Sequence, residues 1–188
     1  MSERSEMRLR LVDQFGGPSG IAAPFREVAT LSSLVAPMGR PAWVVDLVLL
    51  DDQAMAELNK SYRAVPEVTD VLSFSYLLEQ GAGEADLSKG ERLAYHDLWV
   101  DQLESGQQIE EDGPLVGEVI LAPDFVTVRC RERDWPLEKE LPWLLVHGCL
   151  HLLGWRHDQD SERRNMQAEE IRLLAGAGLG HPLAPDSN

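Results

Sequence analysis

The sequence predicts a single domain of the α+β class, with helices packed against a mixed sheet of four or so strands. Its 188 residues suit one domain that is large enough to bury a core without disulfides. Strand-like and helix-like apolar patterns alternate along the chain, and no glycine-rich loop of the GxGxxG or P-loop type stands between them. We therefore expect neither a nucleotide-binding fold nor an organic cofactor.

The first half of the chain contains two predicted strands and two predicted helices. Arginine and leucine alternate in residues 7–13, as in a half-exposed strand, and a Gly-Gly-Pro sequence follows. Residues 25–35 have apolar side chains at helical spacing. Residues 43–50 are strongly apolar, which indicates a strand in the middle of the sheet. Asp51 can then cap a helix that runs through Tyr62.

The second half is expected to hold two more strands, at 71–74 and 117–121, and three helices, at 123–133, 137–153 and 160–175. Pro123 suits the first turn of a helix, and Gly154 ends the longest apolar helix. The tail from Gly176 is rich in glycine and proline, so we expect it to be frayed.

The net charge of −15 is concentrated in residues 76–116, which hold ten acidic and two basic residues. This segment has several glycines and no sustained apolar period, so it is interpreted as a solvated acidic insertion in the single domain. A short helix at 91–103 is possible within it. The rest of the chain carries −7, which does not exclude a nucleic-acid substrate but predicts little long-range attraction for one.

Two further features limit the class of protein. The separation of Cys130 and Cys149 fits neither a disulfide framework nor a zinc-binding cysteine pair. No run of about 18 apolar residues could cross a membrane, and the N-terminus is charged where a signal peptide would be apolar. We expect a cytoplasmic protein without membrane contact.

Three of the five histidines lie within eleven residues, as His147, His151 and His157. Histidines four residues apart share one face of a helix, so their imidazoles can converge on one metal ion. Gly154 allows the chain to turn and bring His157 back as a third ligand. The pattern HxxxHxxGxxH matches the metzincin zinc site, and three nitrogen ligands leave a fourth position for water. The sequence thus predicts one catalytic Zn²⁺ per chain on a central helix.

Other interpretations of these residues stay open. His147 and His151 could be hydrogen-bonded core histidines, and His157 could cap a helix. Gly148 stands where a zinc peptidase carries a glutamate base, which disfavours peptide hydrolysis, and its lack of a side chain would leave room for a larger substrate. Asp158 could bond to a histidine, serve as a proton acceptor or cap a helix.

Several segments, taken in order, resemble the bacterial YbeY-type endoribonucleases. The most specific is the HGxLHLxGxxH signature at 145–157. Weaker matches are an LNxxYR segment at 58–63, a TDVLSF strand at 69–74, a GDI-type strand at 117–120 and a closing helix at 166–171. The resemblance implies a zinc-dependent, cytoplasmic enzyme that cuts single-stranded RNA. It also implies roles in maturing the 3′ end of small-subunit rRNA and in ribosome quality control, with the ribosome or small-subunit assembly proteins as partners.

By the same resemblance, His147, His151 and His157 are the metal ligands and catalytic residues, and Arg63 is a catalytic basic residue near the metal. A guanidinium can bind a phosphate bidentately and stabilise the charge that grows on it during cleavage. The sequence departs from the family pattern at Arg156, where the family usually has aspartate, and in the length of the acidic insertion. A zinc peptidase and a non-catalytic ribosome-assembly factor with a structural metal are the alternatives.

Overall fold

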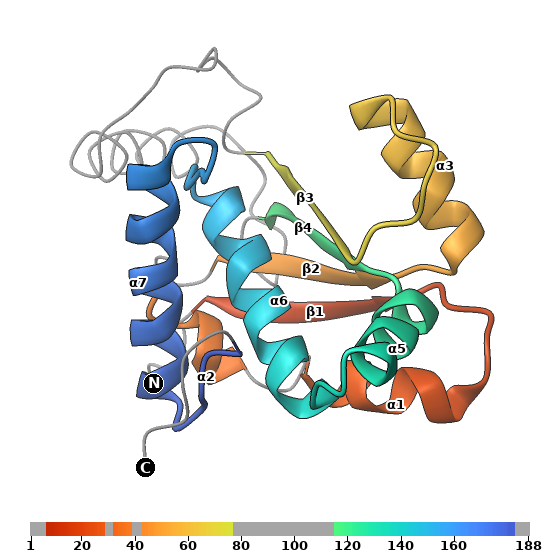
Figure 1. Cartoon of the computed structure of the whole chain (residues 1–188), viewed down its shortest axis with the longest axis horizontal. Coiled ribbons are helices and arrows are strands. Elements are labelled where there is room, and N and C mark those ends of the chain that lie inside the picture. The colour runs from red at the N-terminus through yellow and green to blue at the C-terminus, as the bar shows by residue number, and fades with distance from the viewer. Residues whose placement is uncertain (1–6, 29–31, 39–42, 77–114, 183–188) are drawn as a thin grey trace, which may run out of the picture.

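The computed structural model describes residues 7–28, 32–38, 43–76 and 115–182. Their elements, in chain order, are β1 (Arg8–Asp13), α1 (Ser19–Val28), α2 (Ser32–Val35), β2 (Val44–Leu49), α3 (Asp52–Arg63), β3 (Val71–Ser75), β4 (Leu115–Leu121), α5 (Pro123–Glu132), α6 (Leu137–Leu152) and α7 (Asp160–Gly176) (Figure 1). Within these described ranges, no helix is long and apolar enough to cross a membrane.

The four strands form one mixed sheet in the order β1-β2-β4-β3. β1, β2 and β4 run parallel, and β3 pairs antiparallel with β4 at one edge. All six residues of β2 are buried, because the strand lies between β1 and β4 and both of its faces are covered. The predicted α+β class, the mixed sheet and the central place of this strand are confirmed.

The side chains of the sheet alternate between two apolar layers, as the period of two in a strand requires. One layer contains Leu47, Val119 and Leu121 and packs with residues of α6 and α7. The other contains Val48 and Ile120 and packs with residues of α3. Figure 1 shows α6 crossing one face of the sheet beside α7. The helix that carries the histidines is therefore fixed on both sides.

The helix predicted at 25–35 was placed wrongly. α1 already begins at Ser19, because the Pro18 carbonyl accepts a hydrogen bond of 3.0 Å from the Ile21 amide and starts the first turn there. α1 ends at Val28 and a separate short helix, α2, covers 32–35. The apolar spacing found the buried face but not the boundaries of these helices.

The acidic insertion connects two strands that are neighbours in the sheet. Ser75 of β3 lies opposite Gly117 of β4, and the Tyr76 amide donates a 3.0 Å hydrogen bond to the Val116 carbonyl. β4 begins at Leu115, so the last two residues assigned to the insertion belong to the strand, and Val116 is fully buried. Residues 77–114, and with them the possible helix at 91–103, lie outside the described residues.

The tail after Gly176 is ordered up to residue 182, contrary to the expectation that it frays. The Leu179 amide bonds to the Leu174 carbonyl at 2.8 Å, which closes the end of α7. His181 is 5% exposed and its Nε2 lies 3.0 Å from the Glu170 carboxylate. A buried carboxylate needs hydrogen-bond partners, and the tail supplies one of them.

Candidate metal centre

His147 and His151 occupy the last two turns of α6 and face each other there. Their Nε2 atoms are 3.1 Å apart, and their ring centroids are 4.6 Å apart. The helical spacing of four residues places both rings on one side of the helix, as expected. That side borders a pocket of about 640 Å³, while the opposite side of α6 packs in the core.

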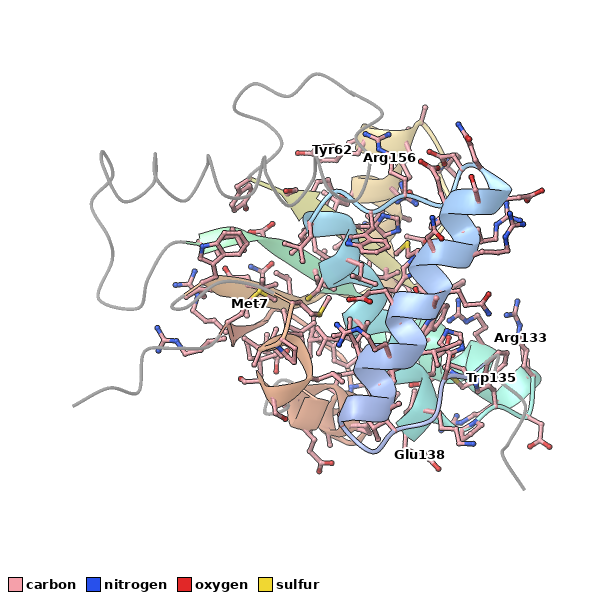
Figure 2. The ribbon with its side chains drawn as sticks, turned by 90° about the vertical axis from the view of Figure 1, so that its left-hand side faces the viewer. Met7, Tyr62, Arg133, Trp135, Glu138 and Arg156 are labelled. Atoms are coloured by element: carbon pink, nitrogen blue, oxygen red, sulfur yellow. The ribbon has the colours of Figure 1, made fainter. Side chains whose placement is uncertain are left out.

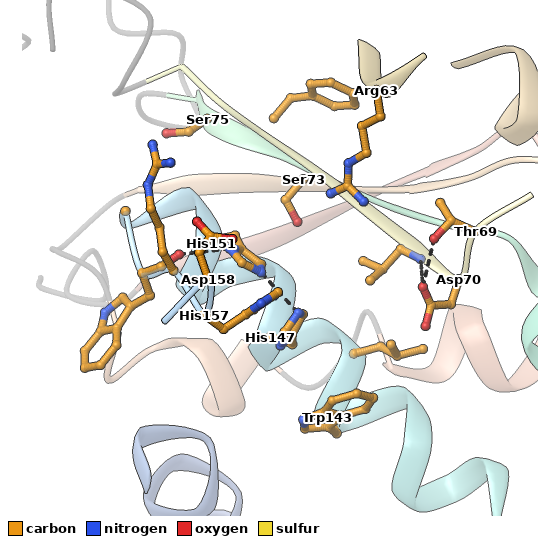
Figure 3. A pocket seen from close by; sticks show the side chains of 16 residues that line it. Arg63, Thr69, Asp70, Ser73, Ser75, Trp143, His147, His151, His157 and Asp158 are labelled. Atoms are coloured by element: carbon orange, nitrogen blue, oxygen red, sulfur yellow. Dashed lines mark hydrogen bonds between the residues drawn. The ribbon is translucent and has the colours of Figure 1, made fainter. Parts of the chain in front are cut away.

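Gly154 turns the chain so that His157 joins the other two histidines. Its φ of +82° is in the left-handed region that favours glycine. The Gly154 amide bonds to the His151 carbonyl at 3.0 Å, and the Trp155 amide bonds to the Leu150 carbonyl at 3.0 Å, which is the Schellman ending of a helix. The three histidines then offer ligand atoms that all lie within 4.8 Å of one another (Figure 3).

The hydrogen bonds of the two helical histidines leave both Nε2 atoms free to bind a cation. His147 Nδ1 lies 2.7 Å from the Glu170 carboxylate, and His151 Nδ1 lies 2.9 Å from the Trp155 carbonyl. Both partners are acceptors, so each Nδ1 carries the hydrogen and each Nε2 carries a lone pair. Two lone pairs that face each other repel unless a cation lies between them. Two nitrogens at 2.0–2.1 Å from a tetrahedral Zn²⁺ would be about 3.3 Å apart, close to the distance here.

The environment of His151 keeps its ring neutral, the form in which imidazole binds a metal. Burial, together with the nearby His147 and His157, lowers the pKa of His151 to about 3. The three histidines therefore fit a bound metal ion in number and convergence, and His151 also fits it in its neutral form.

Glu170 of α7 is a functional candidate that the sequence analysis did not single out. Burial alone would raise the pKa of its carboxyl, but hydrogen bonds from His147, His181 and Trp143 lower it, so the group is ionised. Trp143 donates its indole N–H to the carboxylate at 3.0 Å. Such a carboxylate fixes the tautomer and orientation of a metal-binding histidine. Only the fold reveals this role, because Glu170 is 23 residues from His147 in the sequence.

A bond to a histidine was one of the roles considered for Asp158. It is exposed and lines the pocket near His157 (Figure 3), and Glu170 supplies the carboxylate that bonds to His147. Cys149 is fully buried in the core, and this burial raises the pKa of its thiol to about 12.

Arg63 lines the same pocket as the three histidines but comes from α3. The Asp51 side chain caps α3 by accepting a 2.8 Å hydrogen bond from the Ala54 amide, as predicted. The helix ends directly after Arg63, where Ala64 adopts a φ of +58° and bonds to the Lys60 carbonyl. Figure 3 shows the Arg63 side chain extending toward Ser73 and the histidines. The structure thus brings together all four residues that the sequence analysis selected.

The sequence led us to expect that Gly148 would leave room for a larger substrate, but this residue does not widen the pocket. It is buried against the sheet, where an added Cβ would lie 2.7 Å from Val119 Cγ1 and 3.0 Å from Ser73 Oγ. The glycine lets α6 approach the sheet closely, and a glutamate at this position could not be accommodated without moving the helix. The base of a zinc peptidase is therefore excluded on steric grounds as well as by sequence.

Asp70 lines the pocket and belongs to a group of ion-paired side chains. Arg129 of α5 pairs with both Asp70 and Glu140. Burial would raise the pKa of Asp70, but its contacts with Arg129 lower it. Asp70 is thus held in an ion pair with Arg129, which it shares with Glu140.

The chain is also similar to known proteins. Residues 23–178 match the family model described as "Endoribonuclease YbeY". A protein of that name from Moorella thermoacetica is 38% identical over 135 residues, which cover 72% of this chain and 73% of the relative. Another, from Nocardia farcinica, is 31% identical over 168 residues, covering 86% of this chain and 77% of the relative. The chain therefore belongs to the YbeY family of endoribonucleases.

Proposed function

We propose that this protein is a zinc-dependent endoribonuclease that cleaves single-stranded RNA, with one Zn²⁺ per chain held by His147, His151 and His157. The observation that carries the proposal is the convergence of the three histidines and Arg63 in one pocket. Neutral imidazoles suit zinc, and three of them leave a position for a reacting group. The family supports a role in rRNA processing.

Each of the groups in the pocket has a separate role in the proposed cleavage. Bound zinc supplies positive charge that polarises a phosphoryl oxygen. Arg63 binds the same phosphate through its guanidinium and stabilises the negative charge that develops in the transition state. Glu170 and the Trp155 carbonyl hold the histidine rings in place. The proposal also includes a cytoplasmic location, action on the 3′ end of small-subunit rRNA, ribosome quality control, and the ribosome or its assembly proteins as partners.

Cleavage of a single-stranded RNA by the purified protein tests this function. We expect cleavage that a chelator stops and added zinc restores, since the histidines would lose their metal. Arg63→Gln should lower kcat by about 100-fold or more, the size of effect seen when a charge-stabilising donor is removed. Lys60→Gln is the matched control, because Lys60 is an exposed base on the same helix that does not line the pocket.

His151→Ala, prepared identically, shows whether a contaminating nuclease is present. If the protein binds ribosomal particles but leaves RNA intact in the presence of zinc, the assembly-factor alternative replaces the nuclease. Degradation of casein that survives Arg63→Gln would support the peptidase, against which the buried Gly148 already counts. Mapping the phosphate ends of the RNA products would show whether water or a 2′-hydroxyl attacks.

A further inference from the structure

Arg156 lines the pocket together with Arg63, although the two residues come from different parts of the fold. Arg63 ends α3, and Arg156 lies in the turn between Gly154 and His157. Figure 2 shows Arg156 at the surface, at the same end of the molecule as Tyr62 of α3. The pocket of the candidate metal centre thus holds two arginines that come from separate elements.

The turn does not depend on Arg156 for its structure. Its shape is fixed by the left-handed Gly154, by the backbone hydrogen bonds to α6, and by the bond between His151 Nδ1 and the Trp155 carbonyl. Arg156 itself is exposed, and no ion pair joins it to a carboxylate among the described residues. Within the described part of the chain, this long charged side chain therefore supports no other element and can contact a ligand in the pocket.

The charges that line the pocket favour an anion. Among the lining residues that the structure describes, the charged side chains are Arg63, Arg156, Asp70 and Asp158. Asp70 pairs with Arg129, which Glu140 shares, so among the described residues the charged lining side chains without an ion-pair partner are two arginines and one aspartate. In a chain of net charge −15, long-range attraction for RNA is weak, so binding must come from local groups such as these.

We infer that Arg156 binds a second phosphate of the RNA, separate from the phosphate bound by Arg63. This inference rests on the proposed function and names how the substrate is held: the strand passes through the pocket of the histidines with two of its phosphates bound by different arginines. Arginine binds phosphate bidentately, and such contacts position a single strand without reading its sequence. Arg156 is then a substrate-binding residue, while Arg63 acts at the scissile phosphate.

The salt dependence of RNA binding tests this contact. Loss of one phosphate contact lowers the slope of log K against log salt by about 0.7 for single strands. Arg156→Gln should show that decrease, should raise KM about tenfold and should leave kcat within about twofold, equally for all sequences. Arg156→Lys should restore part of the affinity. Arg164→Gln is the control, because Arg164 is an exposed arginine on α7 that does not line the pocket.

Substrate length gives a second measurement. As an oligonucleotide is shortened from each end, the difference between the wild type and Arg156→Gln should vanish at one end only, once the contacted phosphate is gone. An unchanged salt slope in Arg156→Gln, or a difference that survives shortening from both ends, overturns the inference. If the wild type cleaves RNA while Arg156→Gln is unaffected, this inference alone fails. If the wild type cleaves no RNA, the proposed function fails with it.

Discussion

At the scale of single residues, the buried carboxylate of Glu170 determines which nitrogen of His147 is free. Glu170 Oε1 accepts from Nδ1, while Trp143 and His181 saturate Oε2. The ring of His147 can therefore neither flip nor shift its hydrogen without removing the hydrogen bond that Oε1 of this buried carboxylate receives, which is costly. The position of the metal-binding nitrogen is thus set by residues that do not touch the metal.

Replacing Glu170 with glutamine should weaken zinc binding by about 10- to 100-fold, the usual cost of losing such an orienting partner. The amide keeps the shape of the side chain but loses its charge, so its hydrogen bond to His147 weakens. Competition with a chromogenic chelator measures the affinity, and nitrogen chemical shifts of the His147 ring report its tautomer.

Glu169→Gln is the control for this prediction, because Glu169 is the neighbouring residue and pairs with Arg172 at the surface. The prediction fails if both variants bind zinc as tightly as the wild type. The tautomer of the His147 ring distinguishes the predicted effect from a general loss of stability, because only Glu170→Gln should change this tautomer.

The three histidines could be selected from the sequence because their signals are local. A spacing of four on a helix and a glycine at its end predict the convergence of His147, His151 and His157 without knowledge of the rest of the fold. Arg63 was selected by resemblance alone. Glu170 and His181 lacked any local signal, since their role arises only when α7 and the tail pack against α6.

At the scale of elements, the close approach of α6 to β3 and β4 depends on Gly148. We expect Gly148→Ala to lower the free energy of unfolding, because its Cβ would lie 2.7 Å from the stiff side chain of Val119. Overpacking costs about 1–3 kcal/mol, and the better helix propensity of alanine returns up to about 1 kcal/mol of it. Chemical denaturation measures the net loss.

Gly176→Ala is the matched control at the end of α7, where an added Cβ meets nothing within 4 Å. It should be neutral or slightly stabilising. Equal stability of the two variants would contradict the steric role assigned to Gly148.

The boundaries of the elements were less predictable than their types. Alternation and apolar runs identified all four strands, since each reflects the two faces of the sheet. The start of α1 was missed because its first turn contains Ser19 and Gly20, which carry no apolar signal. The order of the tail was missed because glycine and proline predict turns but not whether those turns pack.

At the scale of the whole molecule, the candidate metal centre joins parts of the chain that are otherwise held separately. His147 and His151 belong to α6, His157 follows the Gly154 turn, and Glu170 ties the site to α7 and to the tail through His181. The acidic insertion enters the fold between β3 and β4, and β3 lines the same pocket through Ser73 and Ser75. A ligand at the histidines should therefore stabilise the fold as a whole.

We expect the purified protein to contain about one zinc per chain and to lose thermal stability when the zinc is removed. A ligand that binds only the folded state stabilises it by about 2.7 kcal/mol when its free concentration is 100 times Kd. For a protein of this size that corresponds to a shift in Tm of about 5–10 °C. Thermal unfolding of the metal-free protein at increasing zinc concentrations measures the shift. His147→Ala should bind no zinc and show no shift, because two histidines do not complete the site. An equal shift in that variant would mean that the zinc acts elsewhere, and the assignment of the three histidines as ligands would be wrong.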